Sequence, residues 1–192
     1  MRPARLVRPL LFLSLLLAAL LAQAEVRPSL QVQTYPVTYR ADASLRQTIT
    51  AASPVRHQGR TFHGYTRWNV KWQFWWMEFP GGQCRIDRTV TQVDAVITLP
   101  ELRGAPTEAQ QVFDRFVTAL REHEMGHYQF GLDAAHRIDQ AIAALPPQPS
   151  CTALQAAANQ LGRRLLDEAI RAEIAYDRDT QHGRTQGAWL ER

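Results

Sequence analysis

The sequence predicts an α+β fold in which helices pack on an antiparallel sheet. In residues 68–76, apolar residues recur at every second position, which is typical of a half-buried strand. In residues 107–145 and again in 152–176, apolar residues recur at steps of three and four, the period of an amphipathic helix. The strand signals lie in the first half of the chain and the helix signals in the second, which is the order typical of an α+β protein.

The first 24 residues have the three parts of a secretory signal peptide. A basic segment, residues 2–8, precedes an apolar run, residues 10–21, and Ala22-Gln23-Ala24 fits the small-x-small cleavage pattern. The apolar run is shorter than the roughly 20 residues that a membrane-spanning helix needs. We therefore expect cleavage after Ala24, no stable membrane anchor afterwards, and a periplasmic or secreted protein.

The remaining residues, 25–192, are expected to form a single domain. Removal of the signal peptide lowers Lys+Arg from 22 to 19 against 18 acidic residues, so the net charge of the mature chain is close to +1. No arginine-rich stripe interleaved with aromatic residues is present. The composition therefore gives no reason to expect a nucleic-acid partner, and it leaves the oligomeric state open.

Cys84 and Cys151 are the only two cysteines of the chain. In an oxidising compartment such a pair predicts one disulfide bond. The alternative, thiolate metal ligands, lacks the C-x-x-C spacing of cysteine metal sites.

The part of the chain before the tryptophans predicts three short segments. Residues 31–40 are expected to form a strand. Residues 43–50 are ambiguous and favour a short helix, whereas the glycines and proline of 53–64 favour a loop.

An aromatic hairpin is expected next. Residues 68–76 form its first strand, residues 80–83 turn the chain, and residues 84–99 return as the partner strand. The apolar positions of the returning strand change parity, which predicts a β-bulge near Thr91-Gln92. The tryptophans of the first strand are expected to face the core.

A long helix opens the second half of the chain. Thr107 and Gln110 make a capping box, and the helical pattern continues to about Leu145. An uninterrupted helix of this length would measure about 57 Å, whereas a domain of this size has a radius of gyration of about 15 Å. We therefore expect the helix to protrude or to bend near Gly126 or Gly131.

A second helix is expected after three prolines that end the first one. Thr152 and Gln155 offer another capping box, and the apolar pattern continues to about Tyr176. Residues 176–183 are polar and are expected to form an irregular tail.

The long helix contains the motif H-E-x-x-H, the two-histidine zinc motif of metallopeptidases. His123 and His127 lie one turn apart on one helix face, so both imidazoles can bind one metal ion. Glu124 lies beside them, where its carboxylate can take a proton from water activated by the metal. With the histidine and glutamate content of this chain, about 0.009 matches are expected by chance.

Both histidines also continue the apolar stripe of the helix between Leu120 and Phe130. An unpartnered buried polar group costs roughly 1–3 kcal/mol, so each imidazole needs a partner. Ordinary hydrogen bonds in the core would meet this need, and so would one shared zinc ion. The motif spacing favours zinc.

Catalytic zinc usually takes three protein ligands. The long helix offers no third group at a usable turn, so the third ligand is expected from the C-terminal part of the chain. The candidates are Glu168, Glu173, Asp177 and His182. We predict His182, an imidazole followed by Gly183, and we expect Tyr176 to hydrogen-bond a tetrahedral oxyanion.

Six segments of the mature chain carry a resemblance to a known family. They are the aromatic strand before Pro80, Cys84-x-Ile86, Ile97-Thr98-Leu99-Pro100, His123-Glu124-Met125-Gly126-His127, Cys151, and Tyr176-Asp177-x-x-Thr180-x-His182-Gly183. Through them the chain resembles a family of predicted secreted bacterial zinc-dependent proteases, otherwise known only as a domain of unknown function. The resemblance implies a zinc-binding protein grouped by its H-E-x-x-H motif.

Three functions are compatible with these features. The leading hypothesis is an exported zinc metallopeptidase of zincin-like α+β architecture that acts on a peptide or protein substrate. The second is a non-enzymatic cell-envelope module with a structural or degenerate zinc site. The third is metal-dependent hydrolysis of a cell-wall amide, which shares the chemistry of the first but not its substrate.

Overall fold

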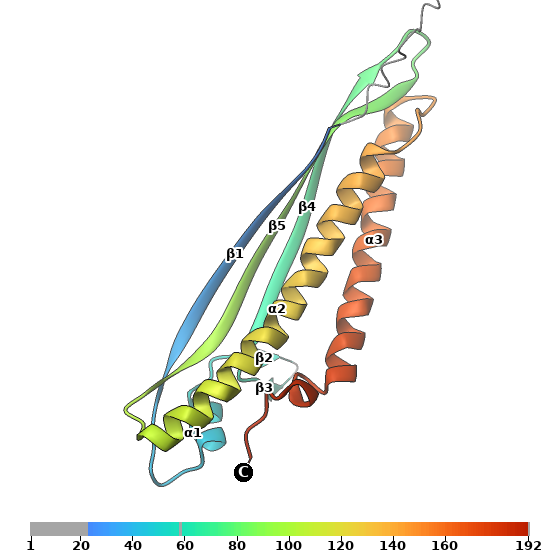
Figure 1. Cartoon of the computed structure of the whole chain (residues 1–192). Coiled ribbons are helices and arrows are strands. Elements are labelled where there is room, and N and C mark those ends of the chain that lie inside the picture. Colours follow the sequence, from blue (N-terminus) through green and yellow to red (C-terminus); the bar gives the residue numbers. More distant parts are fainter. Residues whose placement is uncertain (1–22, 58, 192) are drawn as a thin grey trace, which may run out of the picture.

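A computed structural model describes residues 23–57 and 59–191 of the chain. The signal peptide expected over residues 1–24 lies outside the described residues except for Gln23 and Ala24, which open the first strand. The described chain is elongated: three long strands and two long helices run side by side along one axis (Figure 1). The smaller elements gather at one end of this axis.

The main sheet has three strands in the order β1-β5-β4. β4 (Tyr65–Glu78) pairs antiparallel with β5 (Cys84–Arg103), whereas β1 (Gln23–Thr38) pairs parallel with β5. The α+β class is confirmed, but the expected antiparallel sheet is wrong because the sheet is mixed. Alternation of apolar residues identifies a strand without giving its direction, since direction depends on a partner far away in the sequence.

β5 carries the only register shift of the β4–β5 pair, and it lies elsewhere than expected. Trp75 pairs with Arg88 and Trp76 with Ile86, so Asp87 is the extra residue. The bulge expected near Thr91-Gln92 is therefore wrong. The shift was misplaced because the core face continues through threonines, among them the fully buried Thr89, which a count of apolar residues omits.

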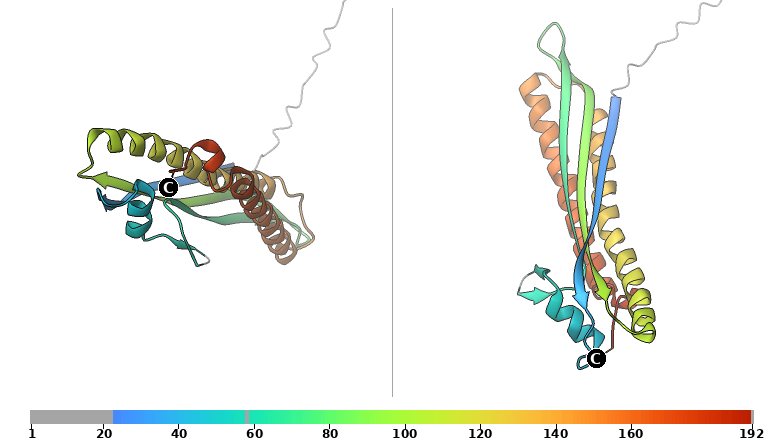
Figure 2. Two further views of the ribbon diagram at one scale, coloured as in Figure 1. Left: turned by 90° about the horizontal axis from the view of Figure 1, so that it is seen from below. Right: turned by 90° about the vertical axis from the view of Figure 1, so that its left-hand side faces the viewer.

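Two long helices cover one face of the sheet (Figure 2). α2 (Thr107–Ala143) has 37 residues and is one continuous helix, about 56 Å long at 1.5 Å per residue. It does not protrude, because the 20-residue β5 extends about 66 Å beside it. α3 (Cys151–Thr180) returns along α2 and includes residues that were expected to be an irregular tail.

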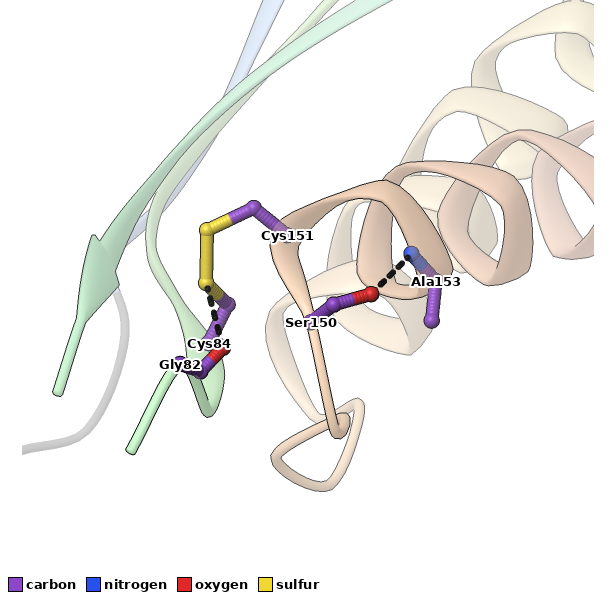
Figure 3. The surroundings of a disulfide bond; sticks show 5 residues. All are labelled: Gly82, Cys84, Ser150, Cys151 and Ala153. Atoms are coloured by element: carbon purple, nitrogen blue, oxygen red, sulfur yellow. Dashed lines mark hydrogen bonds between the residues drawn. A yellow bond between two sulfur atoms is a disulfide. The ribbon is translucent and has the colours of Figure 1, made fainter. Parts of the chain in front are cut away.

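The helix caps differ from those expected. α2 begins after Pro106 without any side-chain cap, and α3 begins after Ser150, whose hydroxyl accepts a hydrogen bond from the backbone N–H of Ala153 at 3.2 Å (Figure 3). The capping boxes expected at Thr107 and Thr152 are therefore wrong. Thr107 follows the N-cap residue Pro106 directly, whereas Thr152 is the second residue after the N-cap residue Ser150.

Short elements close the end of the molecule where α3 finishes. α1 (Leu45–Ala52) confirms the short helix and has a complete capping box between Ser44 and Gln47. β2 (Arg56–His57) and β3 (Arg60–Thr61) form a two-stranded antiparallel sheet inside the segment expected to be a loop. A short 3₁₀ helix, η1 (Arg184–Gln186), follows α3.

One disulfide, which was expected, links β5 to α3 at the opposite end of the molecule. Cys84 at the start of β5 is bonded to Cys151 at the start of α3, with the two Cα atoms 5.0 Å apart (Figure 3). Such a bond fits a protein that folds outside the reducing cytoplasm. Within the described part of the chain, no helix is long and apolar enough to cross a membrane.

The hydrophobic core is divided into two clusters along the sheet. One contains Phe113, Phe116 and Leu120 of α2, and the other contains Ala134 and Ile138 of the same helix. The rings of Trp68 and Trp72 pack against the second cluster. Each ring lies on a helix glycine: a Cβ added to Gly131 would lie 2.9 Å from Trp68, and one added to Gly162 would lie 2.7 Å from Trp72.

Candidate metal centre

The H-E-x-x-H segment lies on α2 between the two core clusters. His123, Glu124 and His127 are only 3%, 4% and 8% exposed, because they continue the helix face that packs on the sheet. A buried group of three polar side chains interrupts an otherwise apolar face. Their partners therefore decide what the site can do.

The Nδ1 atoms of both histidines are held by acceptors. His127 Nδ1 lies 2.9 Å from Glu173 Oε1, and His123 Nδ1 lies 2.8 Å from Gln186 Oε1. A carboxylate and an amide oxygen only accept, so both Nδ1 atoms carry the proton. In a neutral imidazole, the Nε2 atom is then a bare acceptor.

These two Nε2 atoms meet a third acceptor. They are 3.3 Å apart, and Asp177 Oδ1 lies 3.2 Å from each of them. Three lone-pair atoms thus face one another in a nearly equilateral triangle. Only a cation or a proton between them can compensate their mutual repulsion.

The triangle fits a tetrahedral zinc ion. Ligand atoms at zinc–ligand distances of 2.0–2.1 Å and the tetrahedral angle are about 3.3–3.4 Å apart. The three measured distances agree with this value, and the donor set of two imidazoles and one carboxylate suits zinc. The described residues therefore fit the metal that the motif predicts.

The ionisation of these groups without a metal shows the same demand for positive charge. Burial alone would lower the pKa of His127, but Asp177 and Glu173 outweigh it and raise that pKa to about 9. Burial alone would raise the pKa of Asp177, but hydrogen bonds with His123 and His127 bring it well below its ordinary value. A proton on the imidazole takes the position that a metal ion would occupy.

Glu124 is held beside the triangle by β4. The hydroxyl of Thr66 lies 2.7 Å from Glu124 Oε2 and 2.9 Å from its carbonyl oxygen. Burial raises the pKa of Glu124, although Thr66 and the two histidines act in the opposite direction. Gly64 makes room for the carboxylate, since a Cβ there would lie 2.7 Å from Glu124 Oε1. A buried carboxylate with a raised pKa is suited to accept and return a proton.

Asp177 and Glu173 reach the histidines because α3 continues as a helix to Thr180. They are four residues apart, so they lie on one helix face opposite the two histidines of α2. The tail expected at Tyr176 is therefore wrong in its secondary structure. The segment is polar because it faces the metal centre.

His182 lies next to this group but outside the triangle. Its Nδ1 is 3.1 Å from Asp177 Oδ2, its side chain is 41% exposed, and its ring meets the edge of Phe62. At this site the ligand-type atoms that gather within 4.8 Å of one another belong to His123, His127 and Asp177. A second such group within the described residues, Glu78 with Cys84 and Cys151, contains the disulfide-bonded cysteines. Coordination by His182 stays a prediction, and the contact that the structure gives it is with Asp177.

Tyr176 stacks on the His123 ring, with the ring centroids 5.1 Å apart. Its hydroxyl donates to the His123 carbonyl oxygen at 3.2 Å and lies 3.3 Å from Gln186 Oε1. These contacts hold the His123 ring in place. A role of Tyr176 in oxyanion binding stays a prediction. Glu168, another candidate ligand, pairs instead with Arg137 at 2.6 Å on the surface.

Sequence reasoning missed four residues that shape the site. They are Gly64, Thr66, Trp68 and Gln186. No short motif marks them, since they come from β4, the residue just before it and the C-terminal segment, and they meet α2 only in the folded chain. Trp68 matters because its indole N–H donates to Glu173 Oε1 at 2.9 Å, the same atom that His127 binds.

A cavity of about 550 Å³ opens beside the triangle. His123, Glu124, His127 and Asp177 form one wall. Apolar side chains also line the cavity, among them Ile174 of α3, which is 64% exposed. The cavity therefore offers a ligand both polar groups and apolar surface.

The protein is thus a mixed-sheet α+β protein in which two long helices bring together two histidines and an aspartate that could hold a metal ion. Residues 32–183 match the model of the family described as "Bacterial protein of unknown function (DUF922)", and the chain belongs to that family. No curated protein and no solved structure matches the chain.

Proposed function

We propose that this protein is an exported zinc-dependent metallopeptidase. The observation that carries the proposal is the triangle of His123 Nε2, His127 Nε2 and Asp177 Oδ1, with the carboxylate of Glu124 beside it. The triangle supplies three ligands for one zinc ion. Glu124 binds Thr66 and leaves the triangle to the other three side chains.

Zinc bound there would supply Lewis acidity, which polarises a carbonyl group and makes water a stronger acid. Glu124 takes the proton from the attacking water and returns it to the leaving amine. Thr66 fixes the carboxylate through its hydroxyl, so that proton transfer needs little rearrangement. Glu173 and Gln186 hold the two imidazoles in the tautomer that leaves Nε2 free to bind a metal ion.

An extended peptide is the substrate that the surroundings favour. A second hollow of about 210 Å³ lies between residues 65–70 of β4 and α3, and it shares Thr66, Ile170 and Glu173 with the main cavity. β4 is an edge strand of the described sheet. A peptide added along this edge would pass the metal centre.

The cavity also bears on the alternatives. A structural zinc site is closed by four protein ligands, whereas a catalytic site keeps one position open. Three gathered ligands beside a cavity favour hydrolysis over a structural role. A cell-wall amide would need the same catalytic groups, so the choice of substrate must come from assays.

Export completes the proposal. The disulfide fits an oxidising compartment, and the N-terminal segment of the sequence has the pattern of a cleaved signal peptide. We place the mature protein in the periplasm or outside the cell, beginning at Glu25.

The test combines metal analysis with two substitutions in protein purified from an oxidising compartment. We expect one zinc per wild-type chain and hydrolysis of a quenched-fluorescence peptide library. Glu124→Gln should keep the zinc and lose at least about 100-fold in turnover, because it removes the base without removing a ligand. His123→Ala should lose the zinc.

Glu122→Gln is the matched control, because Glu122 is exposed on the same helix. It should retain both zinc and activity. Wild-type turnover in Glu124→Gln would refute the mechanism, and zinc absent from the wild type would refute the centre. Comparing Asp177→Asn with His182→Ala then identifies the third ligand, which we expect to be Asp177.

A further inference from the structure

A second buried carboxylate lies on α2, about three turns beyond His127. Asp139 is only 1% exposed, and the Thr91 hydroxyl of β5 donates to its Oδ1 at 2.9 Å. No lysine or arginine pairs with it within the part of the chain that the structure describes. A buried carboxylate normally has a cationic partner, so this one lacks its usual compensation.

The beginning of β1 lies against this carboxylate. Burial raises the pKa of Asp139, while the Thr91 hydroxyl and the backbone amide of Glu25 both lower it, which places that amide close to the carboxylate. In the β1–β5 register, Ala24 is opposite Thr89 and Val26 is opposite Thr91. The backbone nitrogen of Glu25 therefore lies at the level of both threonines.

Thr89 adds an independent sign of a missing donor or acceptor. It is fully buried, and its hydroxyl has no hydrogen-bond partner. Its register partner, Ala24, is the last residue of the expected signal peptide. The register thus places an unsatisfied hydroxyl next to the position at which cleavage would create a new chain end, on the strand that also contacts Asp139 through Thr91.

Nearby cations are already engaged elsewhere. Arg27 and Arg88 both bind the exposed side chain of Glu25, at 2.7 and 3.2 Å. His136, about one turn before Asp139, is exposed on the surface of α2 and lowers the pKa of Asp139 without forming an ion pair with it. A cation bound directly to Asp139 would therefore have to come from another source within the described residues.

We infer that Asp139, Thr91 and Thr89 form a binding site for the α-ammonium group of Glu25, created by signal-peptide cleavage. Hydrolysis of the Ala24–Glu25 bond by a signal peptidase adds one water, leaving a carboxylate on Ala24 and an ammonium group on Glu25. The ammonium group has three N–H donors, enough for the Asp139 carboxylate and the Thr89 hydroxyl together. The inference rests on the cleavage site of the proposed function, not on zinc.

The composition allows a direct test, because Lys71 is the only lysine of the chain. A mature chain starting at Glu25 has two primary amines, the α-amine and the exposed Lys71. The protein is treated with an amine-acylating reagent near neutral pH, and its intact mass is measured by mass spectrometry at successive times. We expect one rapid label, on Lys71, and labelling of the α-amine at least about tenfold slower than in urea-unfolded protein.

Asp139→Asn should remove this protection and give two rapid labels, whereas the exposed Asp133→Asn should behave as the wild type. An α-amine that reacts equally fast in wild type, Asp139→Asn and unfolded protein would overturn the inference. The α-amine should stay protected from acylation in the presence of a chelator, which would show that its protection does not depend on the metal centre.

A second measurement tests the inference without Asp139→Asn, in case that variant does not fold. A wild-type chain starting at Gln23 retains two more residue pairs of β1 but carries its ammonium group elsewhere. We expect it to melt at a lower temperature than the chain starting at Glu25. An equal or higher melting temperature would overturn the inference, as would an exported protein whose intact mass shows cleavage at another bond.

Discussion

Glu124 and Asp139 are buried carboxylates of the same helix, and burial raises the pKa of each. They differ in access. Glu124 forms part of the cavity wall, so it can exchange a proton with a bound molecule, whereas Asp139 lines neither of the two hollows. At the scale of single residues, the neighbours of a carboxylate, not its burial, separate a proton carrier from an ion-pair partner.

His63 offers a test of residue-level electrostatics away from the metal ligands. Its Nε2 lies 2.8 Å from Thr50 Oγ1, and burial, with a contribution from Arg46, lowers its pKa to about 4. In the unfolded chain the histidine titrates near pH 6.5. Its contribution to stability is therefore complete above pH 6.5 and is lost as the pH falls towards 4, by about 3 kcal/mol.

His63→Gln should remove this dependence. Urea unfolding in chelator at several pH values would give the free energy of unfolding of both proteins. Between pH 7 and pH 4, the free energy of unfolding of the wild type should fall by about 3 kcal/mol relative to that of the variant. The exposed His136→Gln serves as the control. A difference that stays constant with pH would contradict the burial of a neutral imidazole.

Among the elements, β4 contacts each long helix through a tryptophan that packs on a helix glycine: Trp68 on Gly131 of α2 and Trp72 on Gly162 of α3. Gly131→Ala favours the helix locally, but the added methyl group meets the Trp68 ring at 2.9 Å. The ring must move, and its indole N–H then leaves Glu173, which orients His127. We expect zinc affinity to fall about tenfold, the lower end of the range for outer-shell substitutions.

Gly162→Ala is the matched control for that substitution. It meets the Trp72 ring in the same way, but the Trp72 indole binds Asn159, which does not contact the metal centre. Both variants should lose similar stability, whereas only Gly131→Ala should weaken zinc binding in a competition titration with a chromogenic chelator. Equal zinc affinity in the two variants would show that Trp68 does not act on the centre.

The elements themselves were predicted unevenly from sequence. The two long helices, the turn at residues 80–83 and the short helix α1 follow from local periodicity and turn residues, and all are present. The parallel pairing of β1 with β5 is non-local, and no alternation pattern encodes it. Buried threonines concealed the true bulge at Asp87.

The candidate site divides in the same way. His123, Glu124 and His127 stand in one motif on one helix and could be assigned from spacing alone. Asp177 could only be one of several candidates, because the apolar periodicity of α3 stops where its residues turn to the centre. Thr66 and Gln186 come from distant segments and have no motif of their own.

For the whole molecule, the disulfide and the metal centre lie at opposite ends of α3. Cys151 is its first residue and Asp177 lies in its last turn, about 39 Å away at 1.5 Å per residue. The joint variant Cys84→Ser/Cys151→Ser should lower the free energy of unfolding by up to about 4 kcal/mol, because the bridge closes a long loop. Urea unfolding of the zinc-loaded protein measures this loss.

The same variant should still bind one zinc per chain at saturating metal, since no ligand is changed. A loss below about 1 kcal/mol would mean that helix packing alone restrains the chain. Reduced wild-type protein provides the comparison without substitutions.

Because the disulfide and the proposed metal centre lie at opposite ends of α3, the order in which they form affects how the helix is positioned. In a reducing environment the first turn of α3 has no covalent partner, so a zinc ion would have to position the whole helix through its last turn. After oxidation, Cys151 is fixed to β5, and the ion only completes a helix that is already in place. If zinc binds at the proposed centre, we therefore expect it to bind faster to the oxidised chain than to the reduced chain, because the helix that carries Asp177 is then already in place.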